Sequence, residues 1–133
     1  MRELYEGLDD RWNAWAARFN SRLEQEGFPV RVAQMSSVWT MTYTQPSRYN
    51  WMLQFYLRAH GLALSWVGSG RLIFSLNYRD DDLQAVLERL VAASRQMQAD
   101  GWWWRDAVLT DRAIRRGILV EMLARWRGAP AVQ

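Results

Sequence analysis

The chain has 133 residues, a half-hydrophobic composition and a formal net charge of +3. These values fit one compact domain and give no reason by themselves to invoke nucleic acid. Nine tryptophans exclude a disordered chain, and the absence of cysteine excludes a disulfide scaffold, a thiol nucleophile and a thiolate metal site. All 17 basic residues are arginine, so no side chain can form a Schiff base.

The first predicted element is a helix over residues 3–26, followed by a breaking Gly27 and Pro29. Its large apolar residues recur at spacings of four and three, which places them on one helix face. They are Leu4, Leu8, Trp12, Trp15, Phe19 and Leu23.

Residues 30–44 change to a period of two, which predicts a strand with one buried face. The strand is either continuous or broken near Ser36 and Ser37. Its buried face carries Trp39, Met41 and Tyr43.

After Ser47, an expected N-cap, residues 48–60 predict a second helix. We expect its inner face to carry Met52, Phe55, Tyr56 and Ala59. Residues 62–67 and 71–77 then predict two strands joined by a Gly-Ser-Gly turn as a hairpin.

Three aspartates at residues 80–82 open a third helix, where the helix dipole favours carboxylates. Gly101 ends this helix, and a last helix is predicted from about Asp106 to Arg127, capped by Asp106 or by Thr110. Helices that interleave with a few strands indicate an α+β fold, with a small, mostly antiparallel sheet and helices packed on one face.

Three stretches occur in an order typical of one enzyme family. They are residues 32–40 (VAQMSSVWT), residues 56–62 (YLRAHGL) and residues 70–83 (GRLIFSLNYRDDDL). Together they resemble the C-terminal small domain of class-III pyridoxal-phosphate aminotransferases, the group that includes glutamate-1-semialdehyde aminomutase. The likeness divides the chain into an aminotransferase-like domain, residues 1–100, and a Trp-rich helical extension packed on it, residues 101–133.

The resemblance implies the fold of the C-terminal domain of fold-type I aminotransferases. It also implies an upstream catalytic domain that carries the cofactor lysine, and an intact enzyme that is a homodimer with pyridoxal phosphate as cofactor. This chain would help to close the substrate pocket, would bind no cofactor covalently and would be inactive alone. We expect a cytoplasmic protein, because the start of the chain is unlike a secretory signal and no apolar run is long enough to span a bilayer.

Arg71 is the candidate substrate-binding residue. It stands where ornithine-type members of the family place an arginine before their final strand, and that arginine resembles a clamp for a substrate carboxylate. A guanidinium grips a carboxylate with two parallel hydrogen bonds. The alternative is a solvated arginine beside a Gly-rich turn. Phe74 and Ser75 replace the proline pair of that subgroup, so the substrate stays open.

Trp102, Trp103 and Trp104 are candidate interface residues, because tryptophan is enriched at protein interfaces. They are expected to contact the upstream domain or a second copy, or else to lie under the final helix. No catalytic residue and no metal site is predicted: the three adjacent aspartates point in different directions, and His60 is the only histidine.

A free-standing α+β module that binds a protein or RNA is the alternative function. The predicted sheet face of Trp39, Met41 and Tyr43 has few charges near it, whereas RNA-binding sheets expose aromatic residues flanked by basic ones. This pattern favours packing and argues against nucleic acid. An independent enzyme is the weakest hypothesis, because no nucleophile–base pair is evident.

Overall fold

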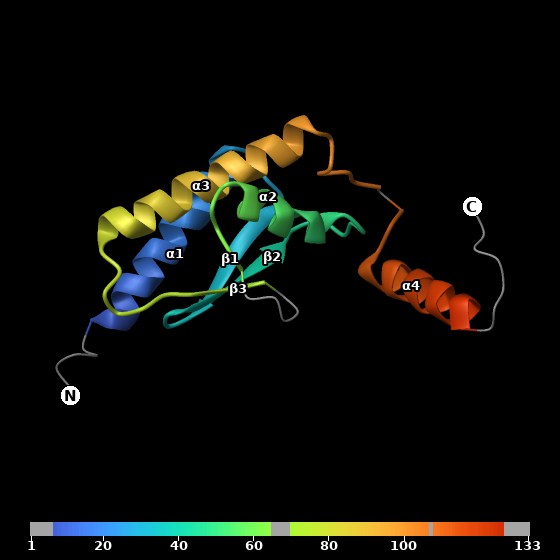
Figure 1. Ribbon diagram of the computed structural model, residues 1–133, viewed down its shortest axis with the longest axis horizontal. Coiled ribbons are helices and arrows are strands. Elements are labelled where there is room, and N and C mark those ends of the chain that lie inside the picture. The colour runs from blue at the N-terminus through green and yellow to red at the C-terminus, as the bar shows by residue number, and fades with distance from the viewer. Residues whose placement is uncertain (1–6, 65–69, 107, 127–133) are drawn as a thin grey trace.

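The computed structural model describes residues 7–64, 70–106 and 108–126. They form an α+β fold with a three-stranded antiparallel sheet, so the predicted fold class is confirmed (Figure 1). The elements in chain order are α1 (Leu8–Gln25), β1 (Val30–Met35), β2 (Val38–Tyr43), the 3-10 helix η2 (Asn50–Met52), α2 (Leu53–Ala59), β3 (Arg71–Ile73), α3 (Asp80–Ala99) and α4 (Asp111–Trp126).

The strands pair in the order β1-β2-β3. β1 and β2 form a hairpin whose two-residue turn is Ser36 and Ser37, so of the two alternatives left open by the sequence, the strand broken at this point is the correct one. Ser36 has a φ of 52°, the left-handed conformation that two-residue hairpin turns favour. β3 lies on the other side of β2 and places Arg71 opposite Thr40.

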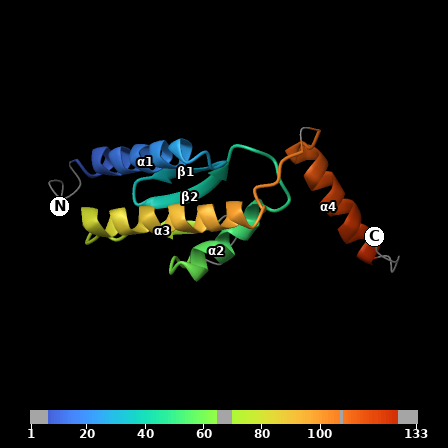
Figure 2. The ribbon, with the colours of Figure 1, turned by 90° about the horizontal axis from the view of Figure 1, so that it is seen from above.

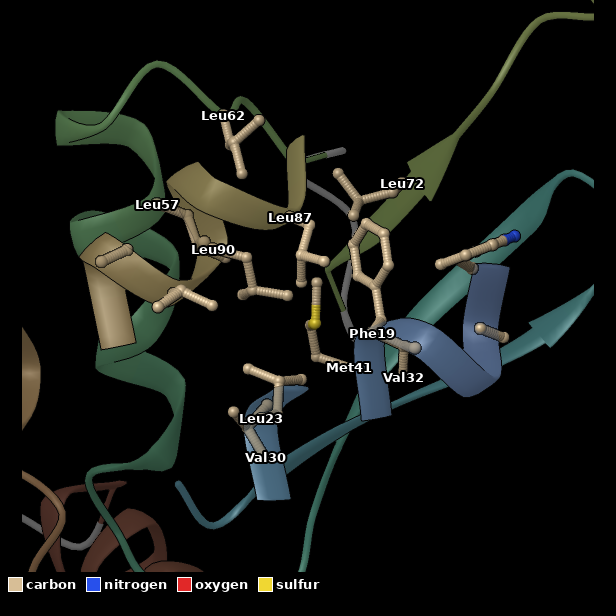
Figure 3. Packing of buried hydrophobic residues seen from close by; sticks show 14 of the residues in the cluster. Phe19, Leu23, Val30, Val32, Met41, Leu57, Leu62, Leu72, Leu87 and Leu90 are labelled. Carbon is tan, nitrogen blue, oxygen red and sulfur yellow. The ribbon is translucent and has the colours of Figure 1, made fainter. Parts of the chain in front are cut away.

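The helices α1, α2 and α3 lie together on one side of the sheet (Figures 1 and 2). α1 packs on β1 and on α3, and α3 also packs on α2. The alternation of the strands sends every second side chain into the layer between sheet and helices. Figure 3 shows part of that core, which includes Phe19, Leu23, Val30, Val32, Met41, Leu57, Leu62, Leu72, Leu87 and Leu90.

Trp39 is the centre of an aromatic cluster within this core. Its side chain is fully buried, and its ring lies 5.1 Å from both the Phe19 and the Phe74 rings and 6.3 Å from that of Trp12. These contacts have edge-to-face geometry, which aromatic pairs prefer. The indole nitrogen donates a hydrogen bond to the carbonyl oxygen of Ser36 at 3.1 Å, so the buried polar atom is satisfied.

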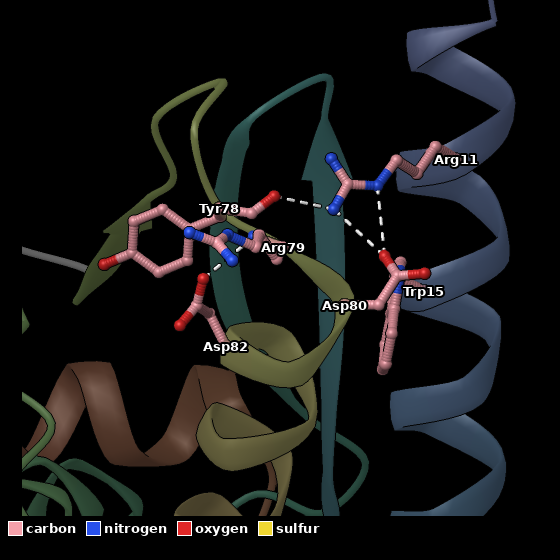
Figure 4. Close-up of polar contacts among 6 residues, drawn as sticks. All are labelled: Arg11, Trp15, Tyr78, Arg79, Asp80 and Asp82. Carbon is pink, nitrogen blue, oxygen red and sulfur yellow. Dashed lines mark hydrogen bonds and ion pairs between the residues drawn. The ribbon is translucent and has the colours of Figure 1, made fainter.

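An ion pair joins the start of α1 to the start of α3 (Figure 4). The Arg11 guanidinium donates to the Asp80 carboxylate, with its Nη2 atom at 3.0 Å, and also to the carbonyl oxygen of Tyr78 at 2.7 Å. The Trp15 indole nitrogen donates to the same carboxylate oxygen at 3.1 Å. The hydrogen bonds from Arg11 first, and then the one from Trp15, lower the pKa of Asp80.

The region after β2 differs from its prediction. The expected helix over residues 48–60 is the short η2 followed by α2, and the fully buried side chains are Leu53 and Leu57, while Phe55 is exposed. Residues 62–64 lie in no strand, and residues 65–67 of the predicted strand lie outside the described residues. β3 ends at Ile73, which pairs with Val38 at the start of β2; the Phe74 backbone N–H then donates to the Ser37 carbonyl oxygen of the hairpin turn, and Ser75 begins a turn.

The last helix begins at Asp111 rather than near Asp106. The Asp106 side chain accepts a hydrogen bond from the Val108 backbone N–H and forms a turn there, whereas the Thr110 hydroxyl accepts one from the Ala113 backbone N–H as an N-cap does. In the described part of the chain, α4 contributes no buried residue. Figures 1 and 2 show it standing beside the α+β body.

Candidate functional site

The outer face of the sheet, opposite the helices, carries the first candidate site. Register places Ala33, Thr40 and Arg71 in one row across the three strands, and Met35, Val38 and Ile73 in the next row. We call these six residues the outer sheet face. Met35 and Ile73 are 76% and 66% exposed. Large apolar side chains this exposed on neighbouring strands make the face a candidate contact surface.

Arg71 lies in the edge strand β3, where its predicted position in a strand is confirmed. It lines a hollow of about 300 Å³ together with residues of the β1–β2 hairpin: Ala33, Gln34, Met35, Val38, Trp39 and Thr40. The hollow therefore combines the Arg71 guanidinium, the Thr40 hydroxyl and the apolar side chains of Met35 and Val38. Such a set can hold a carboxylate by hydrogen bonds and its carbon chain by apolar contact.

This face offers binding chemistry and no catalytic chemistry. Among the described residues that line it, the hollow has no carboxylate, histidine or lysine that could act as a general base and activate the Thr40 hydroxyl as a nucleophile. The described residues also contain no group of three or more His, Asp or Glu side chains able to hold a metal ion. The aspartates at the start of α3 act instead as predicted, since Asp82 accepts a hydrogen bond from the Arg79 backbone N–H at 2.8 Å.

Pyridoxal phosphate does not fit the residues of this chain. Its aldehyde forms a Schiff base with a lysine amine in enzymes that use it, and the chain has no lysine. Among the described residues that line the hollow, Arg71 is the one cation, and no set of backbone N–H groups that would hold a phosphate is found there. A cofactor of this kind would therefore have to be held by another domain.

The tryptophan triplet lies away from Arg71, so the two sets of candidate residues do not form one site. The Trp103 indole nitrogen donates to the Ser94 carbonyl oxygen at 3.0 Å, and its ring lies 6.3 Å from that of Tyr43. Trp102 packs 5.3 Å from Tyr49, ring to ring. Trp102 and Trp103 are thus half-buried on the chain's own body, and Trp104, 45% exposed, is the member most open to a partner.

A second candidate surface, a groove between α2 and α4, was missed by the sequence analysis. One part has a volume of about 350 Å³ and contains Met41, Tyr43, Trp51, Ile114 and Ile118 in its walls. It continues along α2 into a smaller hollow lined by Gln54, Phe55, Arg58 and Leu64, because Gln54 and Leu64 line both. We call the whole the α2–α4 groove.

The sequence contains one feature that could have indicated the exposed aromatic rings of the groove, namely their spacing. Trp51 and Phe55 are four residues apart, so they share a helix face, and their rings lie 5.5 Å apart. The assignment of Phe55 to the inner face was wrong, because the aliphatic Leu53 and Leu57 occupy that face. Burial raises the pKa of Tyr43 to about 12, so the phenol in the groove wall stays neutral.

No known protein-family model matches this chain, and no curated protein matches it. Within the part of the chain that the structure describes, no helix has the length and apolar character required to cross a membrane.

Proposed function

We propose that this chain is the C-terminal small domain of a class-III pyridoxal-phosphate aminotransferase, similar to glutamate-1-semialdehyde aminomutase. It helps to close the substrate pocket of a cytoplasmic, homodimeric enzyme and catalyses nothing alone. The cofactor and its lysine belong to an upstream domain. Arg71 binds a carboxylate of the substrate, and the apolar residues of the outer sheet face contact that upstream domain.

The observation that carries this proposal is Arg71 on an exposed sheet face. An arginine in a strand is held more rigidly than one in a flexible loop, which reduces the entropy lost when its fork closes on a carboxylate. Met35 and Ile73, in the neighbouring row, supply an apolar surface for a second domain. The three family-like stretches, in their order along the chain, support the family assignment.

Substitution of Arg71 in the intact enzyme tests the proposal. Arg71→Ala removes a charge-assisted, bidentate contact worth about 2–4 kcal/mol when it is desolvated. We expect kcat/KM to fall roughly 30- to 1,000-fold for a substrate with a carboxylate at the clamped position. Arg71→Lys should recover little of the activity, because an ammonium lacks the planar fork.

The control is an amine substrate without that carboxylate, for which the loss should be far smaller. Equal losses with both substrates would assign Arg71 a structural role. No loss with either would remove it from the site.

The isolated chain provides a second test, on the cofactor. Borohydride added to a mixture of the chain and pyridoxal phosphate should reduce an adduct only at the α-amino group, because no side chain carries a lysine amine. Peptide mass spectrometry locates the adduct, and a reduced adduct on an internal residue would contradict the proposal that another domain holds the cofactor.

A further inference from the structure

We infer that the outward face of α4 is a docking surface for a second copy of this chain, which binds there through the starts of its helices α1 and α3. Copies joined in this way are arranged head to tail. The inference goes beyond the proposed function and does not depend on it, because neither surface contains Arg71 or any other residue of the outer sheet face.

The contacts of α4 with the body determine which of its faces points outward. Ile114 and Ile118 line the α2–α4 groove, and the Glu121 carboxylate accepts a hydrogen bond from the Arg48 guanidinium at 2.7 Å. These three residues of α4 follow spacings of four and three, so they share the face that is turned to the body. The opposite face is exposed along about 21 Å of helix, at ~1.5 Å per residue. We call it the α4 stripe, and its residues are Arg112, Arg115, Arg116, Leu119, Met122, Leu123 and Trp126.

The α4 stripe has a basic half and an apolar half. Among the described residues, none of its three arginines has an ion-pair partner, and no member of the stripe is acidic. In the second half, Leu119, Met122 and Trp126 are 56%, 64% and 85% exposed. A partner that matches both halves carries carboxylates beside an apolar patch.

Carboxylates gather where α1 and α3 begin, at two helix starts that the ion pair between Arg11 and Asp80 joins at 3.0 Å (Figure 4). Residues 9–11 and 79–82, which we call the acidic end, contain five exposed aspartates against two arginines, a balance of −3. Three of these carboxylates have no ion pair or hydrogen bond with any described residue. They belong to Asp9, Asp10 and Asp81.

Apolar side chains lie beside the acidic end. Leu76 and Tyr78, just before α3, are 46% and 36% exposed. Each of the two surfaces therefore combines a charged part with an apolar part. The charges are opposite, with three unpaired guanidinium groups on the α4 stripe and three unpaired carboxylates at the acidic end.

The two surfaces lie at opposite ends of the longest axis of the molecule (Figure 1). One copy can therefore present its acidic end to α4 of the next copy while its own α4 stays open for a third. A contact between two different surfaces of identical chains repeats in this way as an open chain or closes as a ring.

Charge and apolar content select this occupant over the others. Two α4 stripes repel each other, because each carries three unpaired arginines. Nucleic acid would pair with the arginines but would leave Leu119, Met122 and Leu123 against its phosphates. A bilayer surface binds helices whose basic and apolar residues lie on opposite faces, whereas on α4 both kinds share one face. The acidic end is the matching surface that this chain itself supplies.

Two variants of the full chain, each with one surface blocked, test the inference. The stripe variant, Arg112→Glu with Arg116→Glu, reverses charge on the α4 stripe. The acidic-end variant, Asp9→Asn with Asp10→Asn and Asp81→Asn, removes the unpaired carboxylates. We expect neither variant to form the contact by itself. A mixture should form a one-to-one dimer, because the intact acidic end of the first variant meets the intact stripe of the second.

Sedimentation velocity over a concentration series at about 20 mM salt measures the association. The mixed pair should bind at least about tenfold more tightly than either variant binds itself. Raising the salt to about 0.5 M should abolish this difference, because salt screens exposed charges. Association through the outer sheet face is apolar and is measured separately at the higher salt.

Arg105→Glu with Arg125→Glu is the matched control, because it reverses two exposed arginines outside the stripe, and it should self-associate at low salt as the wild type does. Circular dichroism shows whether each variant is folded. A mixture no more associated than its components, a wild type without salt-sensitive association, or loss of association in the control would overturn the inference. So would an unassociated mixture combined with binding of phosphatidylserine vesicles or oligouridine by the wild type and not by the stripe variant.

Discussion

The two tryptophans Trp39 and Trp51 show how differently one residue type is used in this fold. Trp39 is fully buried among aromatic rings, and Trp51 is more than half exposed on the wall of the groove. Removal of a buried aromatic side chain loses its transfer free energy and leaves a cavity, whereas an exposed side chain loses neither.

We therefore predict that Trp39→Ala lowers the free energy of unfolding by about 3–5 kcal/mol. Trp51→Ala, the same substitution at an exposed site, should lower it by less than about 1 kcal/mol. Urea unfolding followed by circular dichroism measures both variants against the wild type. Similar losses in the two variants would mean that Trp51 is part of the core.

The hydrogen bonds of Asp80 lead us to predict that the free energy of unfolding depends on pH. Its pKa in the folded state lies below its ordinary value of 3.8, because the carboxylate accepts hydrogen bonds from Arg11 and Trp15. The stability gained from these contacts is present above that ordinary value and is lost as the pH falls through the lowered, folded-state pKa.

We expect Asp80→Asn to have a lower free energy of unfolding than the wild type at neutral pH. The difference between the two proteins should begin to shrink below about pH 4 and should disappear once the pH lies below the folded-state pKa of Asp80. Unfolding in urea at a series of pH values measures the gap, with Asp81→Asn at the adjacent acid as control. A gap that stays constant down to acid pH would show that the charge of Asp80 does not contribute.

At the scale of elements, α3 and α4 are both amphipathic but have opposite roles in stability. α3 buries Leu83, Leu87, Leu90 and Met97 between α1, α2 and the sheet. α4 contributes no buried residue in the described part of the chain, and its ion pair with Arg48 is solvent-exposed. Exposed ion pairs contribute little to stability.

Removal of residues 110–133 should therefore change the free energy of unfolding by less than about 1 kcal/mol. Leu90→Ala, a single change inside α3, should cost about 2–5 kcal/mol. Thermal and urea unfolding of the two proteins measure the contrast. If the truncated chain unfolds as readily as Leu90→Ala, α4 is needed for the stability of the body.

At the scale of the whole molecule, the sheet has one covered and one uncovered face. Helices α1, α2 and α3 cover the inner face, and the outer sheet face leaves Met35 and Ile73 in solvent (Figure 1). Apolar side chains gathered on one face favour association, because contact between two such faces removes both from water.

We expect the isolated chain to self-associate as its concentration rises. Sedimentation equilibrium measures the effect, and the double substitution Met35→Glu with Ile73→Glu should restore a monomer. Val108→Glu, at an apolar residue that is 85% exposed elsewhere, is the control and should still associate. A wild-type chain that stays monomeric up to its solubility limit would contradict the role assigned to the outer sheet face.

The periodic patterns of the sequence were sufficient for the long elements. In α1 the stripe of Trp12, Trp15, Phe19 and Leu23 is buried as predicted, and Trp39 and Met41 point into the core from β2. A long helix or a regular strand repeats its apolar spacing often enough that only one face can be the buried one. The α+β class follows from the order of such elements.

Short elements and surfaces were decided by the tertiary structure. In α2 the apolar residues cover most of the helix, so spacing alone cannot choose between Phe55 and the pair Leu53 and Leu57; the surface of α3 against which α2 packs makes that choice. β3 ends at Ile73 because its partner Val38 is the first residue of β2, so the length of β3 depends on where the β1–β2 hairpin turns and not on the local pattern of residues 71–77. The groove likewise arises only when α4 is brought beside α2, since its two walls lie about sixty residues apart in the chain and no local pattern relates them.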